Sequence, residues 1–133
     1  MFAVPASSTL PALKVLIIDD EDDIRRIAKL ALGRVGGMEV VDASSGREGL
    51  RRAEAEPPDV ILLDVMMPGL DGPSTLAALR SNTKTASIPV VFLTAKAMPS
   101  EMERLRDLGA KDVLTKPFDP LTLAQQLRAA LGA

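Results

Sequence analysis

The stretch Val15-Leu16-Ile17-Ile18-Asp19-Asp20-Glu21 decides the fold, because four aliphatic residues in a row lead directly into three acidic ones. An unbroken aliphatic run is typical of a strand that is covered on both faces, as the strands of a parallel sheet are. Four further short aliphatic or β-branched runs follow along the chain. We therefore expect five strands, at residues 15–18, 39–42, 60–63, 90–93 and 113–115.

The segments between these runs carry apolar residues at the spacing of an α-helix. The pattern predicts helices at residues 22–35, 46–55, 73–81, 100–108 and 120–131. Strands that alternate with helices in this way predict an α/β fold, a doubly wound parallel sheet of five strands with helices on both faces.

The first expected helix is amphipathic. Gly36 and Gly37 are expected to end it, and Ser100 is a candidate cap for the fourth helix. The residues expected to form the buried stripe of this first helix are Ile24, Ile27, Ala28, Leu30, Ala31 and Val35. The residues expected on its exposed face are Arg25, Arg26 and Lys29.

The composition restricts both the size of the fold and its chemistry. A chain of 133 residues fits one compact domain, which we expect at residues 12–133 behind a flexible N-terminal tail at residues 1–11. Hydrophobic residues make up 47% of the chain and aromatic residues only 2%, so the core must be aliphatic. The absence of Cys and His excludes disulfides, zinc–thiolate sites and a histidine base. Carboxylates, hydroxyls, Lys, Arg and the backbone remain for chemistry.

The charge pattern does not favour nucleic acid or a membrane as a partner. Sixteen basic and eighteen acidic residues give a formal net charge of −2, and no basic stripe is interleaved with aromatic residues. The first residues lack the pattern of a signal peptide, and no apolar run approaches the roughly 20 residues that span a bilayer. We expect a cytoplasmic protein.

Polar residues follow the ends of the expected strands: Asp19 and Asp20 after the first, Asp64 after the third, Thr94 after the fourth and Lys116 after the fifth. Ligands of open α/β sheets bind beyond the carboxyl ends of the strands. Two carboxylates about 4 Å apart repel by roughly 4 kcal/mol at an effective dielectric near 20, so proton uptake or a cation must offset their charge. With only oxygen ligands present, a hard cation such as Mg²⁺ is the natural candidate.

Each of these residues also has an ordinary structural explanation when it is taken alone. Asp19 or Asp20 could cap a helix, and Asp64 could form a turn. Acidic residues in a first helical turn favour the helix macrodipole, which is how we interpret the segment Glu21-Asp22-Asp23. Only the coincidence of the three aspartates with a threonine and a lysine at strand ends predicts a site.

Four motifs together resemble response regulator receiver domains, the CheY-like family. They occur in the family's order, and the resemblance covers residues 14–131, nearly the whole chain. It implies a flavodoxin-like sheet with strand order 2-1-3-4-5. The motifs are VLIIDDE at residues 15–21, LLDVMMPGLDG at residues 62–72, LTA at residues 93–95 and TKPF at residues 115–118.

The resemblance implies that Asp64 accepts a phosphoryl group from the phosphohistidine of a histidine kinase or a histidine phosphotransfer protein. It also implies that Asp64 binds Mg²⁺ or Mn²⁺ together with three other groups. Asp20 would bind the ion directly, Asp19 largely through a water molecule, and Met66 through its main-chain carbonyl.

The resemblance assigns roles to two further strand ends. Thr94 would donate a hydrogen bond to a phosphoryl oxygen, Lys116 would form an ion pair with it, and the Lys116-Pro117 peptide bond is expected to be cis. Many receivers have Tyr or Phe at the position of Val113, as a side chain that swings inward on activation. An aliphatic residue cannot make that swing, so we expect the movement to be confined to Thr94, the loop after it and a smaller shift of the fourth helix.

These roles describe a signalling switch rather than an enzyme that turns over a substrate. Its expected partners are the phosphoryl donor and a downstream effector protein, and the expected oligomeric state is a monomer or a weak dimer. The chain could be a stand-alone receiver, or a receiver from a longer response regulator or hybrid kinase.

Two other families share part of the chemistry or the architecture. A phosphatase of the haloacid dehalogenase type also uses an aspartyl phosphate, but it has a second acid two residues after the nucleophile, where this chain has Met66. A flavodoxin-like electron carrier needs a turn rich in hydroxyls and glycine after the first strand, and this chain has acidic residues there.

Overall fold

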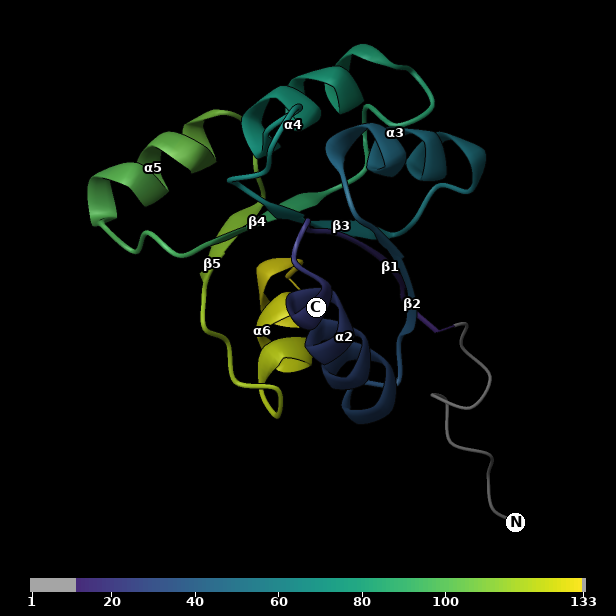
Figure 1. Cartoon of the computed structure of the whole chain (residues 1–133), viewed down its shortest axis with the longest axis vertical. Helices are drawn as coiled ribbons and strands as arrows, with labels where there is room; N and C mark the ends of the chain where they lie inside the picture. The colour runs from purple at the N-terminus through teal and green to yellow at the C-terminus, as the bar shows by residue number, and fades with distance from the viewer. Residues whose placement is uncertain (1–11, 133) are drawn as a thin grey trace.

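The computed structural model of the chain describes residues 12–132, and the tail expected at residues 1–11 lies outside them. Five parallel strands form one sheet in the order β2-β1-β3-β4-β5, which confirms the predicted topology (Figure 1). The strands are β1 (Lys14–Ile18), β2 (Glu39–Ala43), β3 (Val60–Asp64), β4 (Val90–Thr94) and β5 (Asp112–Thr115).

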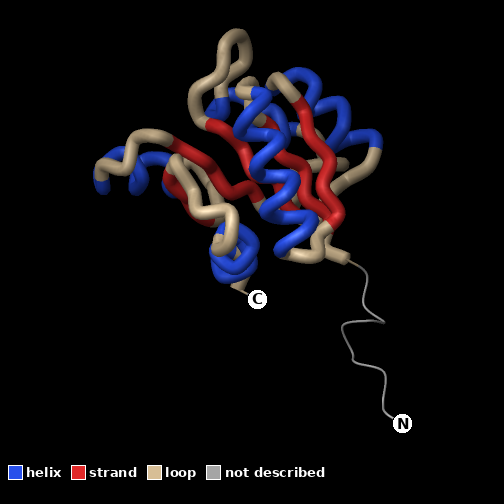
Figure 2. Tube along the Cα trace, turned by 60° about the horizontal axis from the view of Figure 1, so that its bottom comes forward, coloured by secondary structure: helices blue, strands red, loops and turns tan. Residues whose placement is uncertain are grey.

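Helices cover both faces of the sheet, and Figure 2 shows the strands side by side between them. On one face lie α2 (Asp22–Lys29), its π-helical continuation η1 (Leu30–Val35) and α6 (Leu123–Ala130). On the other face lie α3 (Gly46–Ala55), α4 (Gly72–Ser81) and α5 (Pro99–Asp107). This arrangement is the doubly wound α/β fold expected from the sequence.

Alternate residues of each central strand enter two separate aliphatic cores. In β3, Val60 and Leu62 belong to the core beneath α2 and α6, whereas Ile61 and Leu63 belong to the core beneath α3, α4 and α5. All four side chains are fully buried. Each such side chain contributes about 1.5 to 3 kcal/mol of hydrophobic stabilisation, which explains why these strands are apolar on both faces.

The end of the first helix differs from the expected α-helix. From Leu30 the chain forms a π-helical turn, in which the N–H of Gly36 donates to the carbonyl oxygen of Ala31 at 3.1 Å. Leu32 is fully buried, as in an ordinary α-helix, but the wider turn brings Gly36 rather than Val35 to the inward side, so Val35 is exposed. The predicted stripe was therefore wrong for Val35, and also for Ile27 and Leu30, which lie on the exposed side.

Two glycines explain how this helix ends against α6. Gly37 has a φ of +68°, the left-handed conformation that ends a helix, as expected. A Cβ atom on Gly36 would overlap the Cβ of Ala124, so the backbone of the turn packs directly on α6. Arg128 of α6 donates to the carbonyl oxygen of Gly36 at 2.6 Å, which gives this carbonyl at the helix end a hydrogen-bond partner.

The starts of the last two helices also differ from the prediction. The N-cap of α5 is Met98 rather than Ser100, because Pro99 lacks an N–H and suits the first helical position. The last helix begins at Leu123 rather than at residue 120, since the carbonyl oxygen of Asp119 accepts from the N–H groups of Thr122 and Leu123 in a preceding turn.

Replacing Gly72 by Ala should destabilise the fold by about 1 to 3 kcal/mol, because the site offers no room for a methyl group. A Cβ atom there would lie 2.8 Å from the Cα of Val65 and closer still to the carbonyl oxygen of Asp64, and backbone cannot move aside as a side chain can. Urea denaturation followed by far-UV circular dichroism measures the difference. Gly33→Ala is the matched control, because its nearest neighbour would be 3.8 Å away. Equal stability of the two variants would contradict the explanation.

Candidate functional site

Three aspartates meet at the carboxyl end of the sheet. Asp19 and Asp20 follow β1, and Asp64 is the last residue of the neighbouring strand β3. Each offers a carboxylate oxygen that lies within 4.8 Å of the other two. Asp19 is 0% exposed and Asp64 is 4% exposed, whereas Asp20 reaches solvent. The structure thus places the three acids around one small volume, with one of them at its mouth.

Lys116 brings one ammonium group into this volume. Its Nζ lies 2.9 Å from Oδ2 of Asp19 and 3.2 Å from Oδ1 of Asp64, and its side chain is only 11% exposed. The Lys116-Pro117 peptide bond is cis, the isomer expected from the sequence. The main-chain N–H of Lys116 donates to the carbonyl oxygen of Thr94 at 2.8 Å, which fixes the end of β5 to the end of β4.

Thr94 ends β4, next to the strand that carries Asp64, and it is buried. Its Oγ1 accepts from the main-chain N–H of Lys96 at 3.0 Å, so the hydroxyl proton is free to donate elsewhere. A hollow opens beside it, between the loop after β3 and the start of α5, and its lining includes Met66, Thr94, Lys96, Glu101 and Arg104. The expected threonine therefore lines an accessible groove, on the strand next to the one that carries Asp64.

The buried acids carry more charge than the lysine neutralises. Burial, and then the neighbouring charge of Asp19, raise the pKa of Asp64 to about 6, although Lys116 and the backbone N–H of Met66 act in the opposite direction. Burial alone would lower the pKa of Lys116, but its contacts with Asp19 and Asp64 raise it. Oδ2 of Asp19 is buried and, within the described part of the chain, has no hydrogen-bond partner, since its ion pair with Lys116 is not aligned as a hydrogen bond.

This donor set fits a hard divalent cation. The three aspartates supply only oxygen ligands, one oxygen of Asp19 lacks a hydrogen bond, and the net charge of the cluster is negative. Mg²⁺ prefers such carboxylates and keeps several water molecules, for which the exposed side of Asp20 leaves access.

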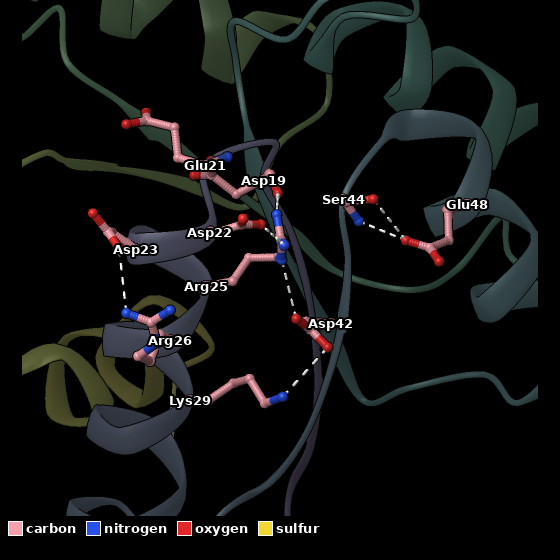
Figure 3. Close-up of polar contacts among 10 residues, drawn as sticks. All are labelled: Asp19, Glu21, Asp22, Asp23, Arg25, Arg26, Lys29, Asp42, Ser44 and Glu48. Carbon is pink, nitrogen blue, oxygen red and sulfur yellow. Dashed lines mark hydrogen bonds and ion pairs between the residues drawn. The ribbon is translucent and has the colours of Figure 1, made fainter.

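Glu21 belongs to the surroundings of this site, which the sequence analysis did not predict. Its Oε1 lies 3.3 Å from Nζ of Lys116, and its N–H donates to Oδ1 of Asp19 at 2.9 Å. Figure 3 shows its side chain extending away from those of Asp22 and Asp23. The helix-dipole interpretation suits these two acids of the first turn of α2, but Glu21 also contacts the site lysine. No local signal could reveal a contact between residues 95 positions apart.

Arg25 was also misjudged from the sequence, which placed it on an exposed face with Arg26. The Arg25 side chain is 14% exposed and that of Arg26 is 72% exposed. Figure 3 shows Arg25 turned toward Asp19 and Asp42, while Arg26 lies beside Asp23. The two neighbouring arginines therefore have different surroundings, and only Arg25 contacts the segment that carries Asp19.

The position of Val113 lies in the core. Its side chain is buried in β5, in the same aliphatic cluster as Leu105 of α5. The position is thus filled by a short side chain packed between the sheet and α5.

Residues 15–128 match the family model of the response regulator receiver domain. The chain belongs to this family. The match decides between the receiver and the two other families considered from the sequence, and it agrees with the four motifs and the observed strand order.

Curated relatives of this receiver include transcriptional regulators. It is 42% identical to the probable transcriptional regulator ycf27 of Guillardia theta, over 89% of this chain and 45% of that protein. It is 40% identical to the alkaline phosphatase synthesis transcriptional regulatory protein PhoP of Bacillus subtilis, over 89% of this chain and 48% of that protein. The receiver spans about half the length of these relatives.

Solved receivers of other kinds share the fold over more than nine-tenths of their length. The chemotaxis response regulator CheY4 of Vibrio cholerae is 34% identical with a TM-score of 0.83, over 90% of this chain and 98% of that chain. The receiver domain of a signal transduction histidine kinase from Syntrophus aciditrophicus is 30% identical with a TM-score of 0.78, over 91% of each chain. In this receiver, no helix within residues 12–132 is both long enough and apolar enough to cross a membrane.

Replacing Asp64 by Asn should stabilise the metal-free receiver above pH 6. The pKa of Asp64 in the folded protein, about 6, lies above its ordinary value of 3.8, so between about pH 4 and pH 6 the folded form binds a proton that the unfolded form has lost. The stability linked to this proton is lost as the pH rises through that window. The full pKa difference corresponds to roughly 3 kcal/mol, and solvent screening should reduce the gain of D64N to about 1 to 2 kcal/mol.

Urea denaturation in a chelator, repeated from acidic to mildly alkaline pH, measures this effect. The difference in the free energy of unfolding between D64N and the wild type should grow up to about pH 6. It should then stay constant, because the titration of Asp64 is complete. Asp71→Asn is the control, since Asp71 is an exposed acid that caps α4 outside the cluster and Asn can also cap. An advantage that did not change with pH would contradict the burial of charge at Asp64.

Proposed function

We propose that this receiver accepts a phosphoryl group on Asp64 from the phosphohistidine of a histidine kinase or a histidine phosphotransfer protein. The observation that supports it is the contact of Asp64 with Lys116 inside a cluster of acids at the carboxyl end of the sheet. In the reaction, a carboxylate oxygen of Asp64 forms a bond to phosphorus, the bond between phosphorus and the imidazole nitrogen breaks, and the donor histidine leaves with that electron pair. With a pKa of about 6, Asp64 is mostly ionised at neutral pH and needs no separate base.

The residues of the acid cluster would hold Mg²⁺ or Mn²⁺. Asp20 and Asp64 would be direct ligands, Asp19 would act largely through water, and the main-chain carbonyl of Met66 would complete the protein ligands. A divalent ion bound here neutralises charge on the phosphoryl oxygens that the three aspartates would otherwise repel. Asp20 is the exposed acid of the three, so a donor would reach the cluster from its side.

Lys116 and Thr94 would hold the transferred group. The ammonium of Lys116, which now pairs with Asp19 and Asp64, would pair with a phosphoryl oxygen once Asp64 is phosphorylated. The hydroxyl of Thr94 has a free proton to donate to another oxygen. These groups would promote both phosphorylation and loss of the phosphoryl group, so the receiver acts as a timed switch.

Phosphorylation would then change how the receiver contacts a downstream effector protein. The relatives include transcriptional regulators, a chemotaxis regulator and a histidine kinase, so the effector could be another part of the same protein or a separate one. A monomeric or weakly dimeric state, a cytoplasmic location and the lack of nucleic-acid binding stay predictions from the sequence.

Incubation with a small phosphodonor and Mg²⁺ should increase the intact mass of the receiver by one phosphoryl group. Asp64→Asn should abolish the increase, because the attacking oxygen is lost, and Lys116→Met should slow it by roughly 100-fold, the usual effect of removing one charge-stabilising group. A chelator should prevent the reaction in the wild-type protein. Asp71→Asn is the matched control and should react like the wild type. A phosphorylated D64N variant would disprove the assignment of Asp64.

Phosphorylation should shift the amide resonances of residues 94–100, although Val113 replaces the usual aromatic residue. The hydroxyl of Thr94 should turn toward the phosphoryl group, and its hydrogen bond with the N–H of Lys96 would move the loop with it. Val113 is buried and small, so a smaller shift is expected in α5. Nitrogen-15 amide spectra with and without the phosphodonor measure this, with D64N as the control. Unchanged resonances at residues 94–100 in the phosphorylated protein would contradict it.

A further inference from the structure

The guanidinium of Arg25 lies outside the acid cluster and holds the peptide group that joins Asp19 to Asp20. Its Nη1 donates to the main-chain carbonyl oxygen of Asp19 at 2.7 Å, and its Nε donates to Oδ2 of Asp42 at 3.1 Å (Figure 3). It also pairs with the carboxylate of Asp22, in the first turn of its own helix. The side chain therefore joins α2, the edge strand β2 and the segment after β1.

The carbonyl of Asp19 lies where the strand has ended and a donor must come from elsewhere. The ladder between β1 and its neighbours ends at Ile18, and the N–H of Asp19 still donates to the carbonyl oxygen of Ala43 at 3.1 Å. Arg25 supplies the donor for the carbonyl on the other side of the residue. The peptide between Asp19 and Asp20 is thereby fixed at its oxygen, and the direction of the Asp20 side chain depends on that peptide.

We propose that Arg25 is a positioning residue for the metal site, which keeps the carboxylate of Asp20 directed toward Asp64. This inference depends on the proposed function, since it concerns the same divalent cation. The planar fork of an arginine can donate to a carbonyl and a carboxylate in two fixed directions at once, which the single ammonium of a lysine cannot do. Asp42, which also contacts Lys29 at 3.5 Å, holds the guanidinium in place from β2.

Two possible roles of Arg25, a source of positive charge or a group that positions Asp20, predict opposite changes in Mg²⁺ affinity when Arg25 is replaced by Met. If Arg25 only contributed positive charge near the acids, its removal would make the cluster more negative and would strengthen Mg²⁺ binding. If it positions Asp20, its removal frees the peptide and weakens Mg²⁺ binding. The loss should be about 10- to 100-fold in affinity, the usual effect of removing a group that orients a metal ligand.

The test is a titration of the nitrogen-15-labelled receiver with MgCl₂, followed by amide shifts. R25M should bind Mg²⁺ about 10- to 100-fold more weakly than the wild type, and Arg25→Lys should recover only part of the affinity. Arg26→Met is the matched control, because it removes the same charge from the exposed neighbour that pairs with Asp23, and its affinity should stay within about twofold of the wild type. Unchanged or tighter binding by folded R25M would overturn the inference.

A second variant keeps the test decisive if R25M does not fold. Asp42→Asn retains the arginine but weakens the anchor of its guanidinium, so it should lower Mg²⁺ affinity in the same direction by a smaller factor. Wild-type affinity in folded D42N and R25K together would overturn the inference. Failure of the wild-type receiver to bind Mg²⁺ would instead disprove the proposed metal site, so the two failures are distinguishable.

Discussion

Two buried carboxylates, those of Asp19 and Asp64, share the ammonium of Lys116 at the carboxyl end of the sheet. Burial raises the pKa of Asp64 to about 6, and the charge of Asp19 adds to this effect because one ammonium cannot neutralise both carboxylates. Such a cluster destabilises the fold at neutral pH. The aliphatic strands offset this effect, because their residues are buried on both faces. The same excess of negative charge would favour a bound cation.

The sheet topology determines which residues can enter this cluster. The order β2-β1-β3-β4-β5 makes β1 and β3 neighbours, so the residues that follow Ile18 and Leu63 meet at one edge. Main-chain hydrogen bonds then continue past the strand ends, from Val65 to Leu93 and from Lys116 to Thr94. The backbone next to Asp64 and that of Lys116 are therefore each held by the neighbouring strand. Positions fixed in this way need little rearrangement when a charged group arrives, which is the usual requirement for electrostatic stabilisation.

The sequence could predict the strands, their order and the meeting of the three aspartates, because these depend on short apolar runs and on a family resemblance. It could not predict which of two adjacent arginines turns inward. Arg25 and Arg26 have the same chemistry, and the difference depends on Asp42, which lies 17 residues away on another strand. The π-helical turn at Leu30–Val35 was missed for a similar reason, since it depends on the contact of Gly36 with α6 rather than on local pattern. Glu21 was assigned to the helix dipole alone because its contact with Lys116 links opposite ends of the chain.

A phosphoryl group on Asp64 would change the partners of Lys116 and thereby the charge on the nearby loop. In the unphosphorylated structure the ammonium lies close to three carboxylates, those of Asp19, Asp64 and Glu21. Formation of the acyl phosphate would remove the negative charge of the Asp64 carboxylate and add phosphoryl oxygens, which attract the ammonium more strongly than the exposed Glu21 can. Thr94 can donate to those oxygens while it still accepts from Lys96, so the loop after β4 follows its hydroxyl. Because Val113 has no aromatic ring to swing, we expect this exchange of polar partners to carry the signal toward α5.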